Sequence, residues 1–156
     1  MFKIHLIAVG KNKERWVREG VAHYAKLLGK FTDLSIICIP EIRKTKNISE
    51  TEVIRREIPL IEKRLSLPYR IALAQTGKAY DSHRLARQLS KILTGHGGGC
   101  DVIIGGAYGL HRNIIEDCHE VLSLSPMTMS HQLIRVVFLE QLYRAFSILA
   151  GGKYHK

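Results

Sequence analysis

The chain has 156 residues and a mass of 17.7 kDa, so we expect one domain spanning 1–156, because two halves would each have a thin core. Apolar residues make up 46% of it and charged residues 24%, which excludes a disordered chain. No apolar run approaches the roughly 18 residues of a membrane span, and residues 1–10 are too short for a secretory leader. We therefore expect a cytoplasmic protein with no membrane partner.

The charge balance is strongly basic. Lys and Arg number 24 against 14 Asp and Glu, a formal net charge of +10. Such a field attracts polyanions and speeds their encounter with the protein. We expect a nucleic-acid partner, RNA before DNA; the alternative is a basic protein whose charge serves solubility only.

Cysteine usage excludes two classes of small domain. Cys38, Cys100 and Cys118 form no C-x-x-C pair, so neither a disulfide framework nor a zinc ribbon is expected. We expect three reduced, mostly buried thiols. His111, Cys118 and His119 come closest to a metal cluster, but adjacent residues point to different faces of a helix, and we expect no metal.

Hydrophobic patterning alternates between strands and helices. Short apolar runs predict strands over 2–9, 34–39, 70–74, 101–104 and 120–124. Apolar residues at three- and four-residue steps predict helices over 14–28, 49–65, 82–93, 112–119 and 131–149. Because the strands are apolar throughout, the sequence predicts an α/β fold with a mostly parallel sheet and helices on both faces.

Four local features refine this pattern. Trp16 belongs to the apolar stripe of the first helix, so we expect it to be buried. Ser49 and Glu52 form a capping box that opens the second helix, and Pro59 should bend or split that helix. The segment 43–47 is basic and has no periodicity, which predicts a loop.

Ligands of parallel sheets bind at the carboxyl ends of strands, and three such ends lie in the second half of the chain. They are a predicted turn at 75–78, a glycine-rich turn at 105–109 and a segment at 125–130. The glycine-rich turn matches neither the dinucleotide fingerprint nor the P-loop, and by itself it also fits an ordinary tight turn. The polarisable side chains of Met127 and Met129 would line a binding site for an adenine or a sulfonium, or else they belong to the hydrophobic core.

Two arginines interrupt the apolar pattern of the last helix, in which we expect Leu133 and Leu149 to be buried. An arginine in such a setting must find an anion or a carbonyl. For Arg144, an ion pair with Glu140 four residues earlier and a functional role remain equal alternatives; Arg135 has no such neighbour on its helix.

The last six residues are either a frayed terminus or an RNA-handling tail. A double glycine leads to Tyr154 and His155 between two lysines. Tyrosine would stack on an unpaired base, the lysines would meet phosphate, and histidine would move a proton near neutral pH.

Several of these motifs occur together and in order. They are Ile104-Gly105-Gly106 with Gly109-Leu110, Leu122 to Ser125 with Met127-Thr128 and His131, Arg135-Val136, Glu140 to Ala145, and Tyr154-His155-Lys156. With them the chain closely resembles, across essentially its whole length, the RlmH family. These are bacterial SPOUT-class methyltransferases that act on N3 of a pseudouridine in helix 69 of the 23S ribosomal RNA.

The resemblance implies more than patterning predicts. It implies a C-terminal trefoil knot, S-adenosyl-L-methionine as the cofactor, and a homodimer whose site is completed near the subunit interface. The implied partner is 23S rRNA within the large subunit or the assembled ribosome. By resemblance, the residues that bind the cofactor are Leu73, Gly105, Leu124, Ser125, Pro126, Met127, Thr128 and Met129.

The resemblance also assigns target-base handling to Arg144, Tyr154 and His155. Arg144 would favour the deprotonated ring, His155 would accept its proton, and Tyr154 would stack or hydrogen-bond. Two other classes compete with this interpretation. One is a non-catalytic basic RNA- or ribosome-binding protein; the other is a nucleotide-binding regulatory domain, disfavoured because no cation follows the glycine turn before Arg112.

Overall fold

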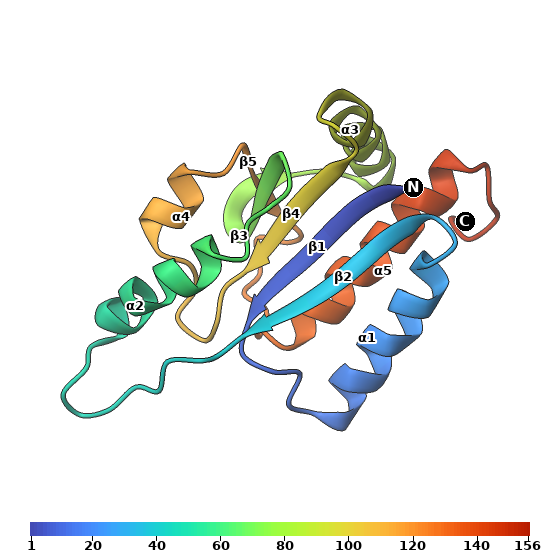
Figure 1. The fold of residues 1–156 in the computed structure, drawn as a ribbon. Helices are drawn as coiled ribbons and strands as arrows, with labels where there is room; N and C mark the ends of the chain where they lie inside the picture. The colour runs from blue at the N-terminus through green and yellow to red at the C-terminus, as the bar shows by residue number, and fades with distance from the viewer.

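The computed structural model describes residues 1–156 as five strands and five helices in alternation (Figure 1). The strands are β1 (Phe2–Val9), β2 (Thr32–Ile39), β3 (Tyr69–Ala79), β4 (Gly99–Ile104) and β5 (Glu120–Ser123). The helices are α1 (Arg15–Leu28), α2 (Glu50–Glu62), α3 (Ser82–Gly95), α4 (Arg112–Glu116) and α5 (Leu133–Leu149). The strand order is β2-β1-β4-β3-β5 and every pairing is parallel. The predicted α/β class and parallel sheet are confirmed.

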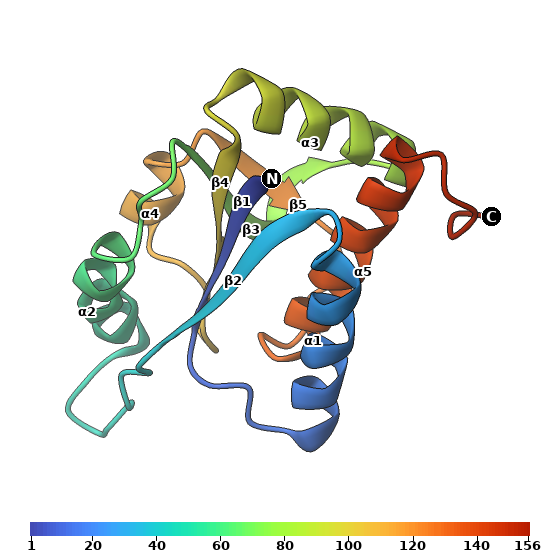
Figure 2. The same cartoon turned by 45° about the vertical axis from the view of Figure 1, so that its right-hand side comes forward.

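Helices cover both faces of the sheet, as the apolar strands predict. Successive side chains of β1 point to opposite faces: Ile4 and Leu6 belong to a large core with α1, α3 and α5, whereas Ile7 and Val9 belong to a smaller core with α2 and α4. Figure 2 shows the two helix layers on either side of the sheet. The strand β1, which has a neighbour on each side, is therefore buried on both faces, which explains its largely apolar sequence.

Several residues expected to be buried lie at the surface. The strand β2 is at the edge of the sheet, and much of it is partly or fully exposed, Cys38 included. Trp16, in the first turn of α1, is 50% exposed, and Leu149, in the last turn of α5, is 45% exposed. Apolar periodicity identifies the face of an element but not how far the sheet and its neighbours extend over that face.

The predicted turn at 75–78 is wrong, because β3 continues through it to Ala79. Pairing with β5 breaks after Leu73 and resumes at Lys78, so the residues between them form an irregularity inside one long strand. Gly77 makes this possible: a Cβ on it would lie 2.6 Å from the backbone of Val121. The strand therefore bends aside just where its carboxyl end was expected, and widens the edge of the sheet there.

The second helix keeps its predicted start and is shorter than expected. The hydroxyl of Ser49 accepts a hydrogen bond from the backbone N–H of Glu52 at 3.1 Å. The carboxylate of Glu52 does not return this bond but binds Arg55 and Arg56. Pro59 does not split the helix, which runs unbroken from Glu50 to Glu62.

No helix in the chain combines the length and the apolar character needed to cross a bilayer. No three side chains of His, Cys, Asp and Glu gather in a way that would hold a metal ion. The trefoil knot stays a prediction.

Candidate cofactor cleft and target-base cluster

A cleft of about 620 Å³ opens at the carboxyl edge of the sheet, across the neighbouring strands β4, β3 and β5. Its walls are the irregular part of β3 (73–75), the turn after β4 (104–110) and the segment between β5 and α5 (124–131). Ile134 of α5 and Glu50 of α2 complete the lining. The three strand ends singled out in the sequence thus meet in one place, where parallel sheets bind their ligands.

Most of the residues expected to hold the cofactor line this cleft. Those that do are Leu73, Gly105, Leu124, Ser125, Met127, Thr128 and Met129. Pro126 belongs to the same segment but is not part of the lining. The structure therefore brings together seven residues that come from three separate parts of the sequence, and it leaves the eighth next to them.

The glycine turn forms one wall by close backbone approach. A Cβ on Gly105 would lie 2.5 Å from the backbone carbon of Gly109, so only glycine fits there. Gly109 has a φ of +79°, which favours glycine, and its N–H donates to the carbonyl of Gly106 at 3.1 Å. The turn therefore presents backbone rather than side chains to a ligand.

The opposite wall is tied to β3 by a side-chain hydrogen bond. The hydroxyl of Thr128 donates to Oε1 of Gln75 at 2.7 Å, and the hydroxyl of Ser125 accepts from the N–H of Met127 at 3.0 Å. Met127 is 76% exposed, so it is not a core methionine. Its thioether lies at the cleft, where an apolar, polarisable group suits an adenine ring or a sulfonium.

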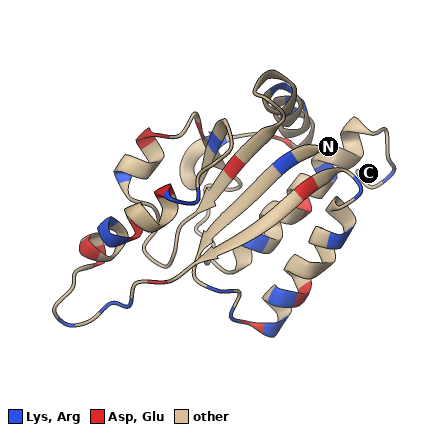
Figure 3. Cartoon of the chain, in the orientation of Figure 1, with Lys and Arg blue, Asp and Glu red and all other residues tan.

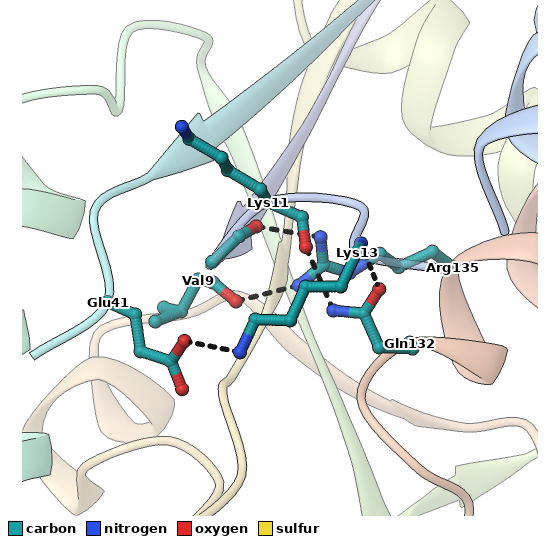
Figure 4. A network of polar contacts seen from close by, with 7 residues as sticks. Val9, Lys11, Lys13, Glu41, Gln132 and Arg135 are labelled. Atoms are coloured by element: carbon teal, nitrogen blue, oxygen red, sulfur yellow. Dashed lines mark hydrogen bonds and ion pairs between the residues drawn. The ribbon is translucent and has the colours of Figure 1, made fainter. Parts of the chain in front are cut away.

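Arg135 fixes the start of α5 to the end of β1. Its side chain is 1% exposed and has no carboxylate partner. Nη2 donates to the carbonyl of Val9 (Figure 4) and Nη1 to that of Gly10, both at 2.7 Å. Nε donates to the carbonyl of His131 at 2.9 Å. The carbonyl partners expected for this arginine are confirmed, and they anchor the segment that forms the cleft wall.

Beside Arg135, the side chain of Gln132 forms a second link between the start of α5 and the loop after β1 (Figure 4). The side chain of Gln132 accepts from the backbone N–H of Lys13 at 3.0 Å and donates to the carbonyl of Lys11 at 2.9 Å. The ammonium of Lys13 lies 2.8 Å from the carboxylate of Glu41. Burial, then the nearby Arg135, lowers the pKa of His131, so the imidazole at the cleft is neutral at pH 7.

The three residues expected to handle the target base form one cluster on the second half of α5. Nη2 of Arg144 donates to Oε1 of Glu140 at 2.5 Å, and the hydroxyl of Tyr154 donates to the same oxygen at 3.1 Å. The guanidinium lies 4.8 Å from the centre of the Tyr154 ring. Nη1 of Arg144 lies 3.3 Å from Nδ1 of His155. The tail thus packs against the helix.

The contacts define the protonation of this cluster. The hydrogen bond to Glu140 raises the pKa of Arg144, and partial burial, followed by hydrogen bonds to Tyr24 and Glu140, raises that of Tyr154. Both therefore keep their protons at pH 7. An arginine only donates, so Nδ1 of His155 is the acceptor in its contact with Arg144.

This cluster and the cleft do not meet within one chain. None of Arg144, Tyr154 and His155 lines the cleft. Ile134, which does, precedes Arg144 by ten residues, about 15 Å along the helix axis. In Figures 1 and 2 the chain ends beyond the last turn of α5, at the other end of that helix from the segment that borders the cleft.

The sequence analysis missed several residues that line the cleft and the hydrogen bonds that tie Gln132 to the loop after β1. Gln75, Tyr108 and Glu50 line the cleft, and Gln132 joins α5 to the loop after β1. Gln75 and Tyr108 belong to the segments 75–78 and 105–109 that the sequence analysis identified, so they could have been predicted as lining residues. Nothing in the sequence pairs Gln132 with residues more than one hundred positions earlier.

Solved structures with the same architecture are methylases. A methylase-family protein of Haemophilus influenzae matches 99% of this chain and 70% of its own with a TM-score of 0.53 at 15% identity. A methyltransferase of Bordetella pertussis matches 92% and 95% with a TM-score of 0.56 at 14% identity. One of Legionella pneumophila, solved with the bound cofactor SAM, matches 97% and 67% with a TM-score of 0.51 at 13% identity. These likenesses show a methylase-type α/β fold.

Sequence comparison is more specific. A family model described as "Predicted SPOUT methyltransferase" matches residues 2–155. A curated relative, ribosomal RNA large subunit methyltransferase H of Bacillus cereus, is 37% identical over 157 residues, which cover 98% of this chain and 99% of the relative. The chain belongs to the SPOUT methyltransferase family. Its expected enzyme class and its cofactor, S-adenosylmethionine, are thereby confirmed.

Proposed function

We propose that this enzyme methylates N3 of a pseudouridine in helix 69 of the 23S ribosomal RNA, in the cytoplasm and as a homodimer. The observation that carries the proposal is the convergence of seven separately assigned residues on one cleft. The near full-length relative named for large-subunit rRNA methylation supports the choice of substrate. The net charge of +10 suits a ribosomal partner.

The residues of the cleft fit the proposed cofactor. Leu73, Ile104 and Leu124 offer an apolar surface, the Gly105–Gly109 turn offers backbone groups without side-chain obstruction, and Glu50 is a carboxylate suited to the cationic end of the molecule. When bound, the cofactor supplies an electrophilic methyl group. The residues that line the cleft would hold the cofactor with its methyl facing the incoming base and would exclude water, which would account for much of the rate gain.

The Arg144 cluster would prepare the base. N3 of the pseudouridine must lose its proton before it attacks, and a guanidinium beside the ring oxygens favours the anion. In the structure this charge is shared with Glu140, so the base oxygens would compete with that carboxylate. His155 would accept the proton through Nδ1, which requires that the ring first release Arg144.

A second copy of the chain would complete the site. The cluster lies about 15 Å of helix away from the cleft in its own chain, too far for one base to touch both. In a homodimer, the Arg144 cluster of one subunit would face the cleft of the other. Each active site would then combine the cofactor cleft of one chain with the tail of its partner.

Mass spectrometry of methylated RNA tests the activity. Ribosomes or rRNA from cells without the enzyme, incubated with the chain and S-adenosylmethionine, should gain one methyl on N3 of a pseudouridine in helix 69. Arg144→Ala should slow methyl transfer about 100-fold or more while calorimetry shows nearly unchanged cofactor affinity. A methyl on another nucleotide would refute the substrate, and equal loss of both properties would refute the division of roles.

Mixing two inactive variants tests the shared site. Gly105→Ala blocks the cleft and Arg144→Ala blocks base handling, so each homodimer should be inactive. If the site is shared, mixed dimers hold one intact site of two, and co-refolded variants should regain up to a quarter of wild-type activity. If Arg144 serves its own chain, both sites of a mixed dimer are broken and no activity returns.

A further inference from the structure

We infer that four cations beside the cleft, Lys11, Arg43, Lys44 and Lys46, bind the phosphate backbone of the RNA that carries the target base. We call them the basic rim. The inference rests on the proposed function, since it concerns how the same RNA is held while its base enters the site. The residues belong to two loops, one after β1 and one between β2 and α2.

The two loops lie side by side at the carboxyl edge of the sheet. The N–H of Gly10 donates to the carbonyl of Ile39 at 2.7 Å, which continues the pairing of β1 and β2 beyond the strands. Glu41 then lies against Gly10 and binds Lys13. Lys11 and the start of the β2–α2 loop are therefore neighbours, although about thirty residues separate them in the sequence.

Both ends of the β2–α2 loop are fixed next to the cleft. At its start, Glu41 is held by Lys13, whose backbone is held by Gln132 at the end of the cleft wall. At its end, Ser49 caps α2, and the next residue, Glu50, lines the cleft. Figure 1 shows the loop projecting from the sheet between these two points. A strand of RNA whose base enters the cleft would pass along it.

The cations of the rim have no acidic partners. Arg43, Lys44 and Lys46 are exposed, and no ion pair involves them or Lys11. No acidic residue occurs from Ile42 to Ser49, and the carboxylate that precedes this stretch, Glu41, is already bound to Lys13. Figure 3 shows the loop with basic residues only along its projecting part.

Basic residues on the helices behave differently. In several of them a carboxylate one turn away binds the cation, as in Arg15 with Glu19, Arg55 with Glu52 and Arg112 with Glu116. Such pairing reduces the charge that is available to a ligand. The rim keeps its full charge beside the cleft, where the substrate would arrive, which points to phosphate as its ligand. The exposed ends of lysine and arginine reach phosphates without reading sequence.

The test compares two variants with the same loss of charge. Arg43→Ala/Lys44→Ala/Lys46→Ala removes three rim cations. Lys63→Ala/Arg64→Ala/Lys91→Ala removes three exposed cations that also have no ion pair, at the far ends of α2 and α3. Both variants change exposed side chains only, so both should fold. Binding of the large-subunit rRNA is measured by fluorescence anisotropy at several salt concentrations, together with the KM and kcat of methyl transfer.

The rim variant should bind RNA about 100-fold more weakly at 0.1 M salt, and its slope of log K against log[salt] should fall by about 2, since each lost phosphate contact changes the slope by about 0.7. KM for RNA should rise while kcat at saturating RNA and cofactor affinity stay unchanged. The control variant should lose much less. Arg43→Lys/Lys44→Arg/Lys46→Arg, which keeps the charge, should restore binding.

Three results would overturn the inference: equal losses in the rim and control variants, an unchanged salt slope in the rim variant, or weaker cofactor binding in it. Failure of the proposed function has a different signature. In that case the wild-type chain transfers no methyl to rRNA, while the anisotropy comparison still decides whether the rim binds RNA.

Discussion

Arg135→Met should destabilise the protein and loosen the cofactor cleft. The buried guanidinium donates to the carbonyls of Val9, Gly10 and His131 and to the side-chain oxygen of Asn12 at 3.0 Å. Methionine has a similar length and no donors. The substitution therefore leaves the inner carbonyls of Val9 and Gly10 without partners and releases the end of the cleft wall from β1.

The expected magnitude follows from these contacts. Each buried carbonyl left without a donor costs about 1–3 kcal/mol, so two cost roughly 2–6. Removing a buried charge returns part of this, because the guanidinium no longer has to be desolvated. We expect a net loss of about 2–4 kcal/mol, which in a chain of this length lowers Tm by roughly 5–15 °C.

Urea unfolding followed by circular dichroism measures the stability, and calorimetry with S-adenosylmethionine measures the cleft. Cofactor affinity should fall about tenfold, and Arg135→Lys should lie between wild type and Arg135→Met because one ammonium cannot serve all four acceptors. Arg87→Met, at an exposed arginine of α3 with no ion pair, is the matched control and should change stability by less than about 0.5 kcal/mol. An Arg135→Met protein that unfolds at the wild-type urea concentration would refute the reasoning.

Two further predictions concern single residues, Glu57 of α2 and Gly105 of the cleft. Burial, with repulsion from Glu41, raises the pKa of Glu57 to about 7; the folded state then binds more protons than the unfolded one between about pH 4.5 and 7, so stability falls as the pH rises through this window. Glu57→Gln should remove this loss and be more stable than wild type by about 3 kcal/mol at pH 8 but not at pH 4; parallel curves in urea unfolding would contradict it. Gly105→Ala should abolish measurable cofactor binding in calorimetry because its methyl group collides with Gly109, whereas Gly95→Ala, which meets no atom within 4 Å, should bind normally.

Local sequence features predicted most elements of the fold well. β1 has the predicted bounds, and the helices over 82–93 and 131–149 differ from α3 and α5 by two residues at one end. β1 and α5 are apolar along most of their length, and α3 has a strong apolar period and a side-chain cap from Asp81, so local physics determines these elements. The irregularity of β3 was not predictable in this way, since it depends on Gly77 packing against the backbone of β5.

The sequence did not predict how exposed individual side chains are, nor which residues distant in the sequence contact one another. Cys38 is apolar in pattern but lies on the edge strand, and strand order is a property of the whole fold. Leu133, expected in the core, is 38% exposed at the first turn of α5. Arg135 was expected to find an anion or a carbonyl, and only the folded chain identifies the carbonyls of Val9 and Gly10. The cofactor residues were assigned through resemblance, whereas spacing alone left each motif ambiguous.

The helix α5 sets the distance between the cofactor cleft and the Arg144 cluster. Its first turn borders the cleft, and Arg144 stands about 15 Å further along. One residue inserted between them would turn Arg144 by about 100° around the axis, off its present face. Two full turns, about seven residues, would restore the face but move the cation by about 10 Å. This stretch of helix must therefore keep its length if the cleft and the Arg144 cluster are to keep their relative positions.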